Sequence, residues 1–281
     1  MFDQILKEIV AREVPEDEVA VLLSGGIDSI SVALTAHRMG KKVTAYTFHL
    51  EGQESYDSKK ATQVAKTFGW DIVDVAVPKT GLVPAWKRLA YKYGCRKKTH
   101  FECIYPFLFV LPLIKEKKVL TGWGADGWFG LSKKAQCNEK YRVKKSIEGL
   151  NKFRDDYFGM DSVAGHKQLK VVASHYALKL VMPYIEEPTV ETFFRSKDWF
   201  ECSGGKQIGG SSQKSIVRRC FQQEIEQIGT VSPHANLQMC SGINVLFDQL
   251  LENTEINFKG RGRLMDVARD WASMNTDVVF A

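Results

Sequence analysis

The sequence has no stretch that could cross a membrane or direct export. Its longest apolar run, 103–114, contains Pro106 and Pro112 and is shorter than the roughly 20 residues needed to span a bilayer. The first residues, 1–14, place apolar side chains at helical spacing among charges, with no basic region before an apolar stretch. We therefore expect a cytoplasmic protein with no membrane partner.

Cysteines are few, and their spacing forms no motif. The six show no CxxC pair and no spacing typical of a zinc site. They stand at positions 95, 103, 137, 202, 220 and 240. We interpret them as reduced thiols of a cytoplasmic protein.

No low-complexity tract or repeat period interrupts the 281 residues. Apolar residues make up 44% and charged residues 26%, as in an ordinary globular protein that buries a substantial core. The net charge of +6 favours phosphate-bearing ligands only modestly and gives weak support for nucleic-acid binding. A solvated basic face explains the same surplus.

Short apolar runs alternate with helical patterns in the first half of the chain. Strands are predicted at 19–23, 43–49, 70–77 and 118–121, and helices at 30–39, 57–68, 82–93 and 103–117. This order predicts an α/β fold, with a parallel twisted sheet and helices on both faces. Ligands of such sheets bind beyond the carboxyl ends of the strands.

Beyond residue 131 the strand pattern fades. Helices are predicted there at 187–195, 213–228, 242–252 and 262–272. We expect an N-terminal helix at 1–18, an α/β core at 19–130, and a helical lobe at 131–281 that covers the sheet or continues the core as one domain. The glycine-rich segment 203–212 is either a flexible connection or a lid that carries Lys206 over a ligand.

A glycine pair follows the first predicted strand, where residues 24–29 read Ser-Gly-Gly-Ile-Asp-Ser. The glycines let backbone N–H groups approach a phosphate, and the following helix offers its positive end. The hydroxyls of Ser24 and Ser29 add donors, and Asp28 suits this place if a divalent cation lies between it and the phosphates. A tight turn with Asp28 as the helix cap is the alternative.

This hexapeptide is neither a Walker loop nor a GxGxxG dinucleotide turn. It resembles the signature of the PP-loop ATP pyrophosphatases. The resemblance implies a PP-loop (HUP-like) fold, an enzyme that cleaves ATP between the α and β phosphates, and a substrate activated as an adenylate.

A second strand also runs into a glycine-rich turn with one aspartate. Residues 119–130, VLTGWGADGWFG, resemble the Gly-Glu-Gly-Ala-Asp-Glu-Leu-Phe-Gly turn of asparagine synthetases and β-lactam synthetases. In that family this aspartate shares magnesium with the signature aspartate. The resemblance therefore implies ATP and Mg²⁺ as cofactors and Asp28 with Asp126 as the metal pair; an ordinary turn aspartate is the alternative for Asp126.

Three looser matches follow. Residues 180–194 are similar to the family's VRVPFLD…VE segment, 213–219 resemble its K-x-x-L-R helix, and 238–250 resemble the end of its synthetase domain. The family lysine contacts phosphate, so the match implies that Lys214 steadies the α-phosphate and pyrophosphate. An exposed helical lysine is the alternative.

The chain departs from the family on the amine side. No amino-terminal glutaminase domain precedes the first strand, so we expect ammonia to be free, to come from a separate glutaminase or other source, or to be replaced by another amine. Trp123 stands where the family has the glutamate that handles the amine. An indole takes no proton, although its face can hold a cation or stack on a ring.

Two sets of contact residues are predicted. The nucleotide site comprises Leu22, Ser24, Gly25, Gly26, Ile27, Asp28, Ser29, Phe48, Thr121, Gly122 and Lys206, with Lys214, Asp28 and Asp126 as catalytic residues. The acceptor site comprises Trp123 and a charged cluster of Arg96, Lys97, Lys98, His100 and Glu102. This cluster is either a solvated loop or a substrate-binding segment in which His100 or Glu102 acts as base.

The leading hypothesis is an ATP-dependent, AMP-forming carbon–nitrogen ligase acting on a small-molecule or nucleotide acceptor. An alternative is a PP-loop enzyme that modifies a nucleobase in RNA, DNA or a nucleotide, with Trp123 as stacking platform. A second alternative is a non-catalytic ATP-binding regulatory protein.

Overall fold

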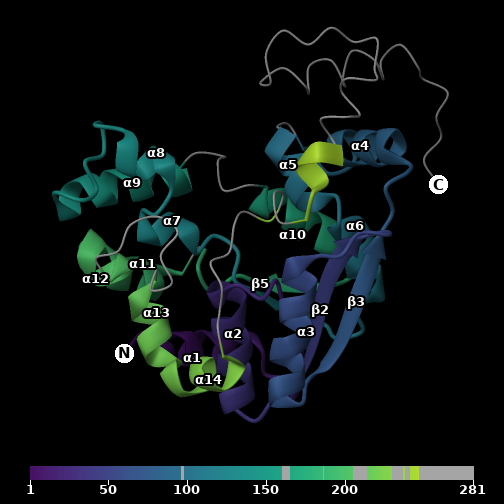
Figure 1. Cartoon of the computed structure of the whole chain (residues 1–281), viewed down its shortest axis with the longest axis horizontal. Helices are drawn as coiled ribbons and strands as arrows, with labels where there is room; N and C mark the ends of the chain where they lie inside the picture. The colour runs from purple at the N-terminus through teal and green to yellow at the C-terminus, as the bar shows by residue number, and fades with distance from the viewer. Residues whose placement is uncertain are drawn as a thin grey trace, which may run out of the picture.

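A five-stranded parallel sheet forms the centre of the computed structural model (Figure 1). The structure describes residues 1–95, 98–159, 165–185, 187–204, 214–229, 237 and 241–246. The strands are β1 (Glu18–Leu22), β2 (Lys42–Leu50), β3 (Asp71–Val77), β4 (Lys118–Thr121) and β5 (Lys179–Val181). Their order in the sheet is β3-β2-β1-β4-β5, and every neighbouring pair is parallel.

The central strand β1 places two turns side by side. Leu22 at its carboxyl end is in register with Tyr46 of β2 on one side and with Thr121 of β4 on the other. The chain runs outward from β1 to β2 and β3, then returns to β4 on the opposite side, so the winding reverses between β1 and β4. In open α/β sheets this reversal is where ligands bind, and both glycine turns lie there.

Helices cover both faces of the sheet, as the alternating pattern predicts. They are α1 (Phe2–Glu13), α2 (Ile27–Arg38), α3 (Tyr56–Phe68), α4 (Leu82–Tyr91), α5 (Lys98–Ile104), α6 (Phe107–Val110), the 3₁₀ turn η1 (Leu111–Leu113), α7 (Asp126–Phe129), α8 (Lys133–Cys137), α9 (Ile147–Gly159), α10 (His166–His175), α11 (Pro188–Arg195), α12 (Trp199–Ser203), α13 (Ser215–Cys220) and α14 (Gln222–Ile228).

Alternate residues of β1 enter two separate cores. Val19 and Val21 pack with α1, α2 and α13 on one face, whereas Ala20 and Leu22 pack with α4, α6 and α10 on the other. This period of two follows from the pleat of a strand. Because both faces are covered, residues 19–22 of β1 form a continuous apolar run after the exposed Glu18.

The structure corrects three predictions from sequence. The strand β5 lies in the segment 131–281, for which only helices are predicted, and it completes the sheet beside β4. The helix predicted at 103–117 is divided into α5, α6 and η1, because Pro106 and Pro112 have no N–H to donate. The helix predicted at 213–228 is two helices, α13 and α14, which meet at Phe221.

Other predicted segments fall largely outside the described residues. These are the 203–212 loop beyond residue 204, the helix 262–272, and most of 238–250, of which 241–246 are described. Within the described part of the chain, no helix combines the length and the apolar character needed to cross a membrane.

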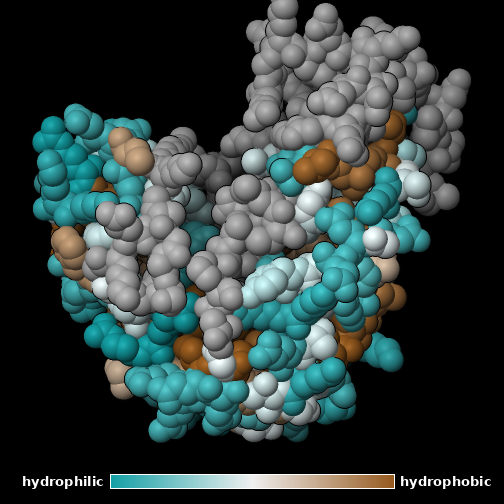
Figure 2. Space-filling view, viewed as in Figure 1, coloured by the Kyte–Doolittle hydropathy of each residue, from teal (hydrophilic) through white to brown (hydrophobic). Residues whose placement is uncertain are grey.

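On the face shown in Figure 2, hydrophilic residues predominate over α8, α9 and α14, whereas apolar residues gather over α4.

The N-terminal helix α1 is part of the main core. Phe2 is 1% exposed and packs its ring against Phe194 and Tyr184. At the other end of the helix, Glu13 forms ion pairs with Arg12 and with Lys179 of β5, each at 2.9 Å. These contacts, with Arg12 first, lower the pKa of Glu13 to about 2.

Candidate functional site

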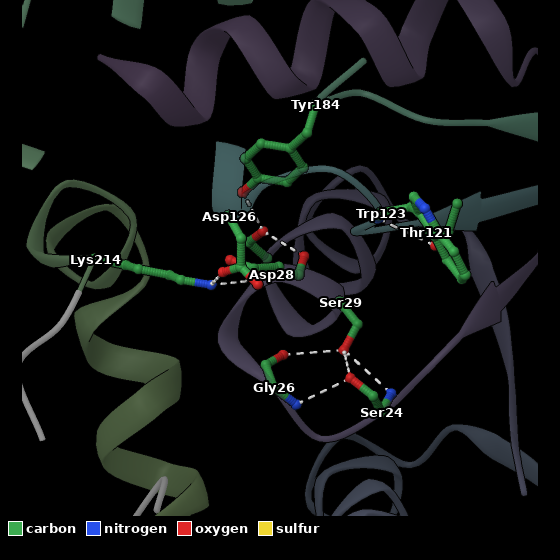
Figure 3. Close-up of polar contacts among 10 residues, drawn as sticks. Ser24, Gly26, Asp28, Ser29, Thr121, Trp123, Asp126, Tyr184 and Lys214 are labelled. Carbon is green, nitrogen blue, oxygen red and sulfur yellow. Dashed lines mark hydrogen bonds and ion pairs between the residues drawn. The ribbon is translucent and has the colours of Figure 1, made fainter. Parts of the chain in front are cut away.

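The turn after β1 is closed by its own hydrogen bonds (Figure 3). The Ser29 hydroxyl donates to the carbonyl of Gly26 at 2.9 Å and accepts from the backbone N–H of Ser24 at 3.2 Å. The N–H of Gly26 donates to Ser24 Oγ at 3.3 Å. Gly26 is the N-cap of α2, so Asp28 lies in the first turn of the helix and not at the cap position.

Glycine at two positions lets other elements approach this turn closely. Gly25 has φ +72°, and a Cβ there would lie 2.9 Å from the Cβ and Cγ atoms of Lys60 on α3. A Cβ on Gly122, after β4, would lie 2.4 Å from the carbonyl carbon of Asp28. The turn after β1 is therefore packed between α3 and the end of β4.

One ammonium joins the two aspartates predicted as a metal pair. Lys214 Nζ contacts Asp28 Oδ2 and lies 2.6 Å from Asp126 Oδ1 (Figure 3). The side chains of Lys214 and Asp28 are 11% and 16% exposed, whereas that of Asp126 is 61% exposed. Carboxylates from α2 and α7 thus lie within reach of a single cation, and the Asp126 side faces solvent.

The environment of Lys214 stabilises its charged form. Burial lowers the pKa of Lys214, but the charges of Asp126 and Asp28 outweigh it and leave the pKa above its ordinary value. Its backbone has φ +62° at the N-cap of α13, a conformation uncommon for residues other than glycine. The Lys214 carbonyl accepts hydrogen bonds from Val217 and Arg218, which hold the residue in place.

A buried tyrosine supports Asp28 from behind, and sequence reasoning did not single it out. The Tyr184 hydroxyl lies 2.8 Å from Ser31 Oγ, which donates to the carbonyl of Asp28 at 2.8 Å (Figure 3). Trp128 of α7 donates its indole N–H to the Tyr184 carbonyl at 2.8 Å. The segment after β5 therefore connects the helices that carry the two aspartates. Tyr184 lies within 180–194, where the family match identifies a segment but no side chain.

Trp123 lies on an aromatic row at the carboxyl edge of the sheet. Its N–H donates to Thr121 Oγ1 at 3.3 Å, and in Figure 3 its indole lies on the opposite side of Asp28 from Lys214. Its ring meets Phe107 edge to face at 5.8 Å, and Phe107 meets Phe48 of β2 in the same way. The nucleotide residues predicted on β1, β2 and β4 (Leu22, Phe48 and Thr121) thus lie along one edge of the sheet.

The charged cluster predicted for the acceptor is only partly described. His100 and Glu102 lie on α5 and are 2% and 4% exposed, so these two residues are not part of a solvated loop. Tyr157 of α9 is buried near the two aspartates: burial first, and then the charges of Asp126 and Asp28, raise its pKa. Arg96, Lys97 and Lys206 lie outside the described residues, as does the side chain of Lys98.

No group of three or more His, Cys, Asp or Glu side chains that could hold a metal occurs among the described residues. The protein itself offers two converging carboxylates. This donor set fits Mg²⁺, which is usually bound by one or two carboxylates together with substrate phosphates and water.

Comparisons with known proteins identify the family of this chain. The family model described as asparagine synthase matches residues 1–225. No curated protein matches the chain. Among solved structures, the chain is similar to a U34-tRNA thiolase from Methanococcus maripaludis, which was solved with its [4Fe-4S] cluster. The two are 13% identical, and the match covers 100% of this chain and 89% of the thiolase. Its TM-score of 0.30 is too low to support a conclusion. Because the family model covers most of the chain, this protein belongs to the asparagine synthase family, whose synthetase domain is of the ATP-using PP-loop type.

Proposed function

We propose that this protein is an ATP-dependent ligase that forms AMP and pyrophosphate. It adenylates a carboxylate or amide-like oxygen and transfers ammonia or another amine to it. The observation that carries the proposal is that Asp28 and Asp126 both pair with the ammonium of Lys214, beside the glycine turn that follows β1.

Mg²⁺ fits this site, with Asp28 and Asp126 as its protein ligands. When bound, it supplies positive charge that stabilises the departing pyrophosphate. The two carboxylates also keep Lys214 charged, so that its ammonium contributes to the same task once ATP brings negative charge to the turn.

The chain's own residues orient the phosphates. The N–H groups at the start of α2 and the hydroxyl of Ser24 bind phosphate oxygens, the Ser29 hydroxyl holds the turn by donating to the Gly26 carbonyl, and Lys214 steadies the α-phosphate. The acceptor oxygen attacks the α-phosphorus, and the bond from that phosphorus to the oxygen bridging to the β-phosphorus breaks. The amine then attacks the activated carbon, AMP leaves with the electrons of the carbon–oxygen bond, and His100 or Glu102 takes the proton that the amine releases.

The amine half of the site differs from the family pattern. Trp123 has no acidic group, and its ring packs on Phe107, so ammonium is not bound there by a carboxylate. The amine comes from free ammonia, from a separate glutaminase in the cytoplasm, or from another small molecule.

Substitution of the two aspartates tests the proposal. We expect Asp28→Asn and Asp126→Asn each to lower pyrophosphate release about 100-fold or more, because charge stabilisation of the leaving group is lost. Asp155→Asn is the matched control: its side chain is 59% exposed and pairs with Arg195 on the surface. Full turnover by either Asp28→Asn or Asp126→Asn, with folding confirmed by circular dichroism, would reject the proposal.

A nucleobase is the alternative acceptor, favoured by the half-buried indole of Trp123 at the carboxyl edge of the sheet. Thiolation is disfavoured, because burial raises the pKa of both Cys95 and Cys103 to about 12 and leaves neither as a thiolate. A filter-binding assay with tRNA and DNA across a series of salt concentrations tests whether the acceptor is a nucleic acid. If the protein retains neither in a salt-sensitive way, a nucleic-acid acceptor is eliminated.

A further inference from the structure

One lysine beside the glycine turn has no role in the site described above. Lys60 of α3 is 6% exposed, and its Nζ is buried without a hydrogen-bond partner among the described residues. A buried ammonium without a partner is unfavourable, because it loses its hydration and gains no compensating hydrogen bond. A lysine on a helix that covers a sheet normally keeps its ammonium at the surface. The neighbouring Lys59 does so: its side chain is 61% exposed and its ammonium pairs with Glu54.

The stem of Lys60 lies directly on the glycine turn. A Cβ on Gly25 would be 2.9 Å from both Lys60 Cβ and Cγ, and 3.2 Å from the backbone nitrogen of Ala61. The absence of a side chain at position 25 therefore makes room for the Lys60 stem against the turn.

A second cation reinforces the positive potential around the turn. Arg218 of α13 lies close enough for its charge to act on Lys60: burial first, and then Arg218, lower the pKa of Lys60, against the opposing charge of Asp57. Arg218 also interacts with the charge of Asp28. Lys214, by contrast, already has two carboxylate partners. Among the residues that the structure describes, Lys60 is a cation beside this turn whose charged end has no hydrogen-bond partner.

The N-terminal turn of α2 begins at the same place, so backbone N–H groups and the Lys60 stem converge on the glycine turn. Backbone N–H groups and a lysine ammonium are both hydrogen-bond donors, and phosphate oxygens are acceptors that can bind to both. We propose that Lys60 is a pyrophosphate-binding residue, whose ammonium pairs with the β,γ-phosphates of ATP and with the pyrophosphate product. This assignment rests on the proposed function, because it places a nucleotide in the turn.

The test compares Lys60→Met with Lys59→Met by titration calorimetry, using inorganic pyrophosphate with Mg²⁺ and then ATP with Mg²⁺. We expect Lys60→Met to weaken pyrophosphate binding about 10- to 100-fold, the effect of losing a charge-assisted hydrogen bond. Its midpoint of unfolding without ligand should be equal to or higher than that of the wild type, because an unpaired buried charge is removed. Lys59→Met should change neither quantity.

The outcomes separate this inference from the proposed function. If the wild type binds pyrophosphate and Lys60→Met binds it equally well, the role of Lys60 is overturned and the proposed function stands. If the wild type binds neither pyrophosphate nor ATP, both are overturned. Lys60→Gln is a second uncharged variant should Lys60→Met fail to fold, and Lys60→Arg should retain binding through its charge.

Discussion

The packing of β4 against α2 gives the sharpest prediction. A Cβ on Gly122 would lie 2.4 Å from the carbonyl carbon of Asp28, 2.7 Å from its oxygen, and 2.5 Å from the nitrogen of Ser29, where ordinary contact is 3.4–4 Å. All three are backbone atoms in the first turn of a helix, so none can rotate away. Gly122→Ala must therefore separate the end of β4 from the start of α2 by about 1 Å.

This displacement has two measurable costs. Overpacking of this kind destabilises a protein by about 1–3 kcal/mol, and the rigid backbone at this contact favours the upper end. The same displacement moves Asp28 relative to Asp126, and a misplacement of about 1 Å at a reacting centre costs about 100-fold in rate. We expect both a lower midpoint in urea unfolding and a loss of pyrophosphate release in Gly122→Ala.

Gly159→Ala is the matched control. A Cβ there meets nothing within 4 Å in the described part of the chain, and the residue has no positive φ. The substitution should leave both stability and turnover unchanged, or stabilise slightly, since alanine favours a helix over glycine. Wild-type unfolding and turnover in Gly122→Ala would refute the close contact and, with it, the shared placement of the two aspartates.

Two further predictions concern stability. Arg154 is fully buried and donates two hydrogen bonds to the Trp128 carbonyl, from Nε at 3.0 Å and from Nη2 at 2.8 Å. Arg154→Met should therefore lower the free energy of unfolding in urea by about 2–4 kcal/mol. It should also lower pyrophosphate release, because α7 is held less firmly. The pKa of Glu13 is lowered to about 2 by Arg12 and then by a lysine of β5. The ionised Glu13 therefore stabilises the fold above about pH 4.5, and this stabilisation is lost as the pH falls toward 2. Glu13→Gln should flatten that part of the curve of stability against pH, as measured by urea unfolding.

The part of the fold that repeats a simple pattern could be predicted. The strand predicted at 118–121 coincides with β4, and the first three strands agree within one residue at each end. The fifth could not be found, because β5 has three residues and no alternation of its own. Its pairing with β4, with Leu180 in register with Val119, is a tertiary contact that local sequence does not encode.

In the site, too, local sequence patterns could be recognised, whereas tertiary contacts could not. Asp28 and Asp126 could be singled out from the sequence because each lies in a glycine-rich turn after a strand, and such turns have a local signature; their role stays a prediction. Lys60 was missed, since charge on a helix ordinarily indicates a solvated face. A signal existed: Lys60 precedes the buried Val64 by four residues and therefore lies on the buried face of α3.

The site is built jointly by segments on both sides of residue 131. Asp28 and Asp126 come from the first half of the chain, but Lys214 comes from α13, and Tyr184, which follows β5, connects to both α2 and α7. Arg154 of α9 holds the carbonyl of Trp128, two residues after Asp126. A separately folding core at 19–130 would therefore lack the cation between its aspartates and the residues that hold α7 in place. This is why Arg154→Met should reduce turnover as well as stability.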